Sequence, residues 1–205
     1  MAGQMIEFNA NGSQAPGYLA TPDATGGASA PGIVVLHEWW GLTETYRQVC
    51  DRLAEAGFIA LAPDLYRGKT TTSVEEAEVL GATLDQNEEQ WRGDVTGALD
   101  FLRNNGASSP ADGRGAFGFV AGSLGGSYAL DMSIKLADEI AAVVTFYATY
   151  SGLDYHDARA AYLCHFAGND PFNSPEEVAE MEQALKDAGK RATFYIYPGT
   201  GHWFI

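Results

Sequence analysis

Residues 115–126 read GAFGFVAGSLGG, and they give the clearest indication of how the chain folds. The apolar, glycine-rich run that ends at Gly122 predicts a buried strand, and a helix is expected from about Leu124 with no loop between them. Ser123 lies between the two among small residues, which is typical of a sharp strand-to-helix turn that presents a serine. Such a turn directs the backbone N–H of Leu124 into the site, at a helix N-terminus where an oxyanion would be stabilised.

Outward from this stretch, apolar runs of strand length alternate with segments of helical periodicity. The predicted strands are 33–36, 58–62, 140–147, 162–166 and 193–197. The predicted helices are 46–54, two within 74–104, one from about 124, and one that starts at a capping box in residues 174–177. A hairpin of residues 5–8 and 17–20, joined at Asn11 and Gly12, precedes them. The alternation predicts one α/β domain over residues 1–205, with a mostly parallel sheet and helices on both faces.

The chain of 205 residues is strongly acidic, with a formal net charge of -15. Such a surface repels phosphate and anionic lipid, so we expect neither nucleic acid nor membrane as a partner. Cys50 and Cys164 fit no metal-ligand spacing and are interpreted as reduced thiols of the core. No metal or organic cofactor is indicated. The start of the chain has no signal-peptide pattern, which predicts a cytoplasmic protein.

Polar side chains follow several of the predicted strands, where a parallel sheet places its chemistry. Ser123 follows one strand, Asp170 the next but one, and His202 the last. In this chain order the three match the nucleophile, the orienting acid and the base of α/β-hydrolases. Taken singly, each has a simpler explanation: a glycine-rich turn, a turn aspartate before proline, and a solvated histidine on a mobile glycine-rich loop.

The strand 33–36 ends in HEWWGL, residues 37–42. This loop is expected to lie beside Ser123 and to supply a second oxyanion donor, the N–H of Trp39. Glu38 is unusual beside the nucleophile of a simple esterase. The alternative role for Glu38 is that of a structural carboxylate in a salt bridge.

Five segments together resemble the dienelactone hydrolase (carboxymethylenebutenolidase) family of the α/β-hydrolase superfamily. They are HEWWGL at 37–42, PDLY at 63–66, SLGG at 123–126, GND at 168–170 and GHWF at 201–204. The resemblance implies hydrolysis of a small-molecule ester or lactone through a covalent acyl-enzyme. It implies Ser123 as the nucleophile, His202 as the base and Asp170 as the residue that orients this base. It also implies that Glu38 interacts with the nucleophile at rest.

The sequence departs from the family pattern in three places. The best-known members have cysteine as the nucleophile, whereas this chain has Ser123, which depends more on its base. Residues 120–122 stand between Gly118-Phe119 and the nucleophile as an apparent insertion, and the sequence does not decide whether the serine keeps its catalytic position. The chain stops at Ile205, so we expect the usual C-terminal helix to be missing.

The substrate is less well defined than the chemistry. Arg67 and Arg92 are candidates to bind the carboxylate of a charged lactone, and Trp40 and Tyr147 are candidate pocket walls. Two rival functions stay open. One is a general short-chain carboxylesterase or acyltransferase, and the other is a non-catalytic binding protein on the same fold, which the altered turn favours. A homodimer is left open as well.

Overall fold

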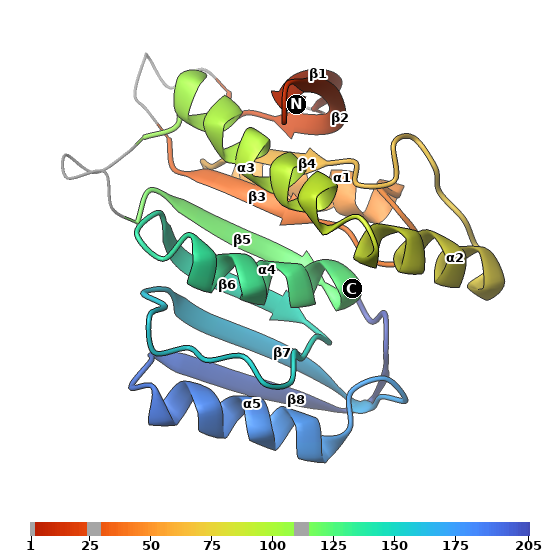
Figure 1. Cartoon of the computed structure of the whole chain (residues 1–205), viewed down its shortest axis with the longest axis vertical. Coiled ribbons are helices and arrows are strands. Elements are labelled where there is room, and N and C mark those ends of the chain that lie inside the picture. The colour runs from red at the N-terminus through yellow and green to blue at the C-terminus, as the bar shows by residue number, and fades with distance from the viewer. Residues whose placement is uncertain (1–2, 24–29, 109–114) are drawn as a thin grey trace.

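Figure 1 shows the computed structural model of the protein, which describes residues 3–23, 30–108 and 115–205. Within these residues one eight-stranded sheet has the order β1-β2-β4-β3-β5-β6-β7-β8. The strands are β1 Gln4–Ala10, β2 Ser13–Ala20, β3 Gly32–Leu36, β4 Ile59–Pro63, β5 Phe117–Gly122, β6 Ile140–Phe146, β7 Ala161–Asn169 and β8 Ala192–Gly201. The pairings from β4 to β8 are parallel, whereas β2 pairs antiparallel with β1 and β4. The predicted mostly parallel α/β sheet is confirmed.

Helices cover both faces of this sheet, as predicted. They are α1 Glu44–Glu55, α2 Val74–Asp85, α3 Glu88–Asn104, α4 Ser123–Lys135 and α5 Pro175–Asp187. In Figure 1, α3, α4 and α5 lie in front of the sheet and α1 lies behind it. The larger hydrophobic core fills the side of α3, α4 and α5. A smaller core forms behind the sheet, where Tyr46 and Cys50 of α1 pack with Val35 and Ala60.

Local sequence signals explain several of these elements. Trp91, Val95 and Leu99 form the predicted apolar stripe of α3 and are at most 3% exposed. Asn11 and Gly12 have φ angles of 51° and 75°, the left-handed conformation that a tight hairpin turn requires. The elements therefore arise where the residue pattern places them.

Two further local predictions concern α5 and the cysteines. The capping box at the start of α5 is present, because Ser174 Oγ accepts the N–H of Glu177 at 3.2 Å and the Glu177 carboxylate accepts the N–H of Ser174 at 2.8 Å. Cys50 and Cys164 are both free and buried, as expected. No helix in the described part of the chain has the length and apolar character needed to cross a membrane.

The parallel pairing decides where functional groups can meet. β5 lies between β3 and β6, and β7 lies between β6 and β8. Because parallel strands end at a common edge of the sheet, the residues that follow β3, β5, β7 and β8 share that edge.

Candidate active site

Ser123 is the first residue of α4 and follows β5 without a loop. Its φ of 48° is left-handed, which is a strained conformation for a residue with a Cβ atom. The first turn of α4 is in close contact with two other segments of the chain. A Cβ atom at Gly125 would lie 2.4 Å from the carbonyl oxygen of His37, and one at Gly126 would lie 2.4 Å from the Cβ atom of Ala148. The two glycines therefore let the segments after β3 and β6 contact the first turn of α4.

The extra residues before Ser123 do not interrupt the strand that leads to it. Residues 118–122 of β5 pair with residues 142–146 of β6 in unbroken register, and the irregularity in this pairing lies at the far end of the strand. Gly122 instead makes room for a side chain of α1, because a Cβ atom at Gly122 would lie 2.2 Å from the hydroxyl oxygen of Tyr46. β5 therefore stays in register with β6 up to the turn at Ser123.

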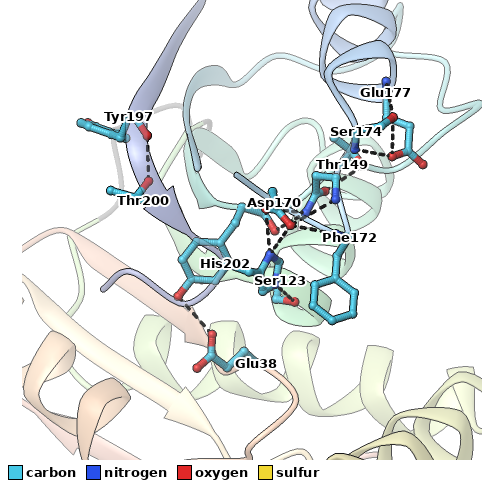
Figure 2. A network of polar contacts seen from close by, with 12 residues as sticks. Glu38, Ser123, Thr149, Asp170, Phe172, Ser174, Glu177, Tyr197, Thr200 and His202 are labelled. Carbon is cyan, nitrogen blue, oxygen red and sulfur yellow. Dashed lines mark hydrogen bonds and ion pairs between the residues drawn. The ribbon is translucent and has the colours of Figure 1, made fainter. Parts of the chain in front are cut away.

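Pairing of β7 with β8 brings Asp170 and His202 together. Asn169 pairs with Gly201 in parallel register, so the next residues of the two strands leave the sheet side by side. The sequence predicted a mobile loop before His202, but β8 continues to Gly201 with a bulge between Tyr197 and Gly201. Bulges re-aim neighbouring side chains, and this one precedes the histidine that points at Ser123 in Figure 2.

The three side chains form a continuous hydrogen-bonded row (Figure 2). His202 Nε2 lies 2.9 Å from Ser123 Oγ, and His202 Nδ1 lies 2.8 Å from Asp170 Oδ2. The His202 and Asp170 side chains are only 3% and 2% exposed. Because a carboxylate only accepts hydrogen bonds, Nδ1 donates to it and Nε2 is left to accept the serine proton. Burial lowers the pKa of His202 below its ordinary value of 6.5, although Asp170 opposes this effect. The lowered pKa favours the neutral imidazole at pH 7.

Asn173 supports this row, and sequence reasoning missed it. Asp170 Oδ1 accepts the backbone N–H groups of Phe172 at 2.9 Å and of Asn173 at 3.2 Å. The Asn173 side chain also donates to the carbonyl of Tyr147 at 3.0 Å and accepts the Thr149 hydroxyl at 3.0 Å. Asn173 thus ties the Asp170 turn to the segment after β6. The only signal in the sequence is an Asp-x-x-Asn spacing, which is common in ordinary turns.

Glu38 takes neither of the roles predicted for it. Its Oε2 accepts the hydroxyl groups of Tyr147 at 3.0 Å and of Tyr46 at 3.3 Å, and the residue is 5% exposed. In the described residues Glu38 forms no salt bridge, and the Ser123 hydroxyl contacts His202 instead of this carboxyl. Burial raises the pKa of Glu38 to about 7, and the two tyrosine hydrogen bonds oppose this rise. Glu38 therefore titrates near neutral pH.

Tyr147 is not a pocket wall, because it is fully buried. It has a φ of 42°, and its ring centroid lies 4.6 Å from that of His202. Its hydroxyl donates a hydrogen bond to Glu38, so this tyrosine lies between the buried carboxyl and the imidazole. Trp40, the other predicted wall, is half-buried, with its ring centroid 5.1 Å from that of Trp203.

Leu124 and Trp39, the predicted oxyanion donors, both have side chains close to Gly81 of α2. Leu124 is the second residue of α4, so its N–H has no partner within the helix. Trp39 comes from the loop that follows β3. A Cβ atom at Gly81 of α2 would lie 2.9 Å from Trp39 Nε1 and 3.8 Å from Leu124 Cδ2, so both side chains contact the same point of α2.

Arg67 and Arg92 have structural partners in place of the predicted substrate carboxylate. Arg67 Nη2 lies 2.7 Å from Asp94 Oδ1. Arg92 pairs with Glu88 at 2.7 Å and with Asp131 at 3.2 Å. Asp131 lies in α4 eight residues beyond the serine, about 12 Å along the helix axis. In the described residues no group of three His, Cys, Asp or Glu side chains forms a metal site either.

The fold and the serine–histidine–aspartate row define an α/β-hydrolase. The model of the Dienelactone hydrolase family matches residues 15–205, so the chain belongs to this family, as the sequence resemblance indicated. It is a hydrolase that acts on esters or lactones.

Individual relatives agree with this membership. The chain is 32% identical to Protein usf of Aquifex pyrophilus over 99% of this chain and 87% of that protein. It is 27% identical to a protein of Aquifex aeolicus provisionally named carboxymethylenebutenolidase, over 99% of this chain and 87% of the relative. A solved structure from Klebsiella pneumoniae, provisionally named dienelactone hydrolase, has the same fold. Its TM-score is 0.84 at 22% identity, covering 98% of this chain and 87% of that one.

Proposed function

We propose that the protein cleaves a carboxylic ester or lactone through an acyl-enzyme on Ser123. His202 is the general base, and Asp170 orients it. The observation that carries this proposal is the 2.9 Å contact between Ser123 Oγ and His202 Nε2, with Nδ1 held by Asp170 at 2.8 Å. A serine hydroxyl aimed at a neutral imidazole is the arrangement that acyl transfer requires.

In the first half of the reaction, His202 Nε2 takes the proton of Ser123 as Oγ attacks the substrate carbonyl carbon. The backbone N–H groups of Leu124 and Trp39 bind the oxyanion of the tetrahedral intermediate. The intermediate collapses, and the imidazolium returns its proton to the leaving alcohol oxygen. The products of this half are the alcohol and an ester of Ser123.

In the second half, water replaces the alcohol. His202 takes a proton from a water molecule as the water oxygen attacks the acyl carbon. His202 then donates this proton to Ser123 Oγ as the acyl–oxygen bond breaks. The carboxylic acid leaves and the serine is regenerated. Serine is a weaker nucleophile than a cysteine thiolate, so the aligned base accounts for more of the rate here.

The substitution Ser123→Ala tests the proposal. Hydrolysis of p-nitrophenyl acetate is expected to fall roughly 10⁴-fold or more, because the nucleophile is removed. A fluorophosphonate probe is expected to label the unaltered protein at Ser123 and to leave the variant unlabelled.

The control is Ser127→Ala, one turn further along the same helix. Ser127 Oγ donates to the carbonyl of Thr149 and is not part of the proposed row, so this variant should keep both activity and labelling. Unlabelled, folded and inactive wild-type protein would contradict the proposal and favour the non-catalytic binding protein.

A further inference from the structure

Aromatic rings surround one side of the proposed base. The ring centroid of Phe172 lies 4.8 Å from that of His202, 5.8 Å from Trp39 and 5.3 Å from Trp203. The Trp203 ring in turn lies 4.8 Å from His202. Phe172 nevertheless remains 48% exposed, and it packs on the imidazole that contacts Ser123 (Figure 2). An exposed aromatic cluster next to a nucleophile is a surface on which a ligand ring can pack.

The geometry of the reaction assigns this cluster to one side of the substrate. The imidazole must protonate the leaving alcohol oxygen, so the alcohol group has to lie next to His202. The oxyanion donors Leu124 and Trp39 define where the carbonyl oxygen lies. Phe172 and Trp203 contact the imidazole ring itself, and they therefore face the alcohol part of the ester.

The charges around the site disfavour an anionic substrate. In residues 3–23, 30–108 and 115–205 no lysine or arginine side chain forms a hydrogen bond or ion pair with Ser123, Asp170, His202 or the rings around them. The carboxyl groups of Asp170 and Glu38 lie close by, and the chain as a whole carries a net charge of -15. The negative charge of the chain would therefore repel a substrate carboxylate.

We propose, on the basis of the function proposed above, that the preferred substrates are neutral esters of aromatic alcohols, and that Phe172 determines this preference. The alcohol ring packs against Phe172 and Trp203 while Ser123 attacks the carbonyl. A ring-to-ring contact of this kind is worth about tenfold in kcat/KM, mostly through KM.

Three acetate esters of similar size test the proposal: benzyl acetate, cyclohexylmethyl acetate and 4-carboxybenzyl acetate. We expect kcat/KM for benzyl acetate to exceed that of each of the other two by about tenfold. Added salt should raise kcat/KM for the carboxybenzyl ester alone, because it screens the repulsion. Equal or faster hydrolysis of the anionic ester at low salt would overturn the proposal.

The variant Phe172→Leu keeps an apolar side chain and removes the ring. It should bring the ratio of benzyl to cyclohexylmethyl ester close to one. Tyr195→Leu is the matched control, because Tyr195 is 50% exposed and stacks on His165 away from the site. An unchanged ratio in Phe172→Leu would overturn the role of Phe172. If wild-type protein hydrolyses all three esters equally, only this inference fails. If it hydrolyses none and the fluorophosphonate does not label Ser123, the proposed function fails with it.

Discussion

Two buried carboxyl groups lie near the edge of the sheet where the site forms, and they differ in their partners. Asp170 faces the imidazole of His202 and accepts two backbone N–H groups of its own turn. Within the described residues, the Glu38 carboxyl accepts hydrogen bonds from the hydroxyl groups of Tyr46 and Tyr147 alone. The first carboxyl is connected to the proposed nucleophile through a base, whereas the second contacts no base among residues 3–23, 30–108 and 115–205.

This difference shows that the donors around a carboxyl decide its task more than its position in the chain does. N–H donors and an imidazole make Asp170 an acceptor that fixes one tautomer of the base. Two phenol groups compensate the burial of Glu38 only in part, so its pKa rises to about 7. Glu38 therefore holds Tyr147, whose ring packs on His202, without belonging to the hydrogen-bonded row.

The largest expected effect comes from Asp170→Asn. An asparagine can donate to Nδ1 and so stabilise the wrong tautomer of His202, and kcat for ester hydrolysis should fall by roughly 10³- to 10⁴-fold with the fold intact. The control is Asp154→Asn, which alters the exposed Asp154–His156 pair at 2.6 Å and should leave kcat unchanged. A loss below tenfold in Asp170→Asn would remove the proposed distinction between the two carboxyls.

The second prediction concerns Glu38 and pH. Its pKa is raised from 4.5 to about 7 in the folded protein, so the folded state holds this proton more tightly than the unfolded chain. This contribution is fully present below pH 4.5 and is lost as the pH rises to 7, which amounts to about 3 kcal/mol of unfolding free energy. Urea denaturation at pH 4.5, 6 and 8 should show a smaller decline in Glu38→Gln than in the wild type. If the unfolding free energies of the two proteins declined in parallel with pH, this prediction would be contradicted.

Tyr147→Phe should have a smaller effect that depends on the same titration. The change removes one of the two hydroxyl groups that bind Glu38 and keeps the ring on His202. At pH 8, where Glu38 is ionised, the unfolding free energy should fall by about 2 kcal/mol, and at pH 5 by less. The comparison is Tyr195→Phe, because Tyr195 forms no part of this cluster. Equal losses at both pH values would show that the hydroxyl does not serve the ionised carboxyl.

The smallest effect is a shift in the pH profile of the enzyme. Only neutral His202 can accept the proton of Ser123, so kcat/KM should fall as the pH drops. Burial lowers the pKa of His202, which places the midpoint of this fall below 6.5. Asp170 raises this pKa, so the residual activity of Asp170→Asn should have a still lower midpoint. A midpoint above 6.5 in the wild type would be inconsistent with burial as the dominant influence.

Much of the site could be predicted because its elements obey local rules. Apolar runs such as residues 33–36 suit strands buried on both faces, and the pairing confirms them as parallel. Once the strands are parallel, Ser123, Asp170 and His202 must reach one edge of the sheet. The residue pattern therefore predicts that the three side chains share one edge, whereas the contacts between them depend on strand register.

Other features could not be predicted from neighbouring residues. The segment 198–201, PGTG, has the local preferences of a loop, and it belongs to β8 only because Gly201 pairs with Asn169. Glu38 accepts hydrogen bonds from Tyr46, eight positions away, and from Tyr147, 109 positions away. No spacing rule predicts these contacts. Arg67 and Arg92 also pair with Asp94 and Asp131 of other elements, which no spacing rule connects, whereas the Glu88–Arg92 pair in α3 has the local i,i+4 spacing.

The amino-acid pattern alone predicts the α/β class, the succession of strands and helices along the chain and the kinds of side chain that reach the active edge, because these depend on hydrophobic periodicity and on residues close together in the chain. The partners of Glu38, the orientation of His202 and the fit of Gly122 against Tyr46 emerge from the folded chain. Those contacts join residues from separate elements, and they depend on strand register and on which side chain fills each space.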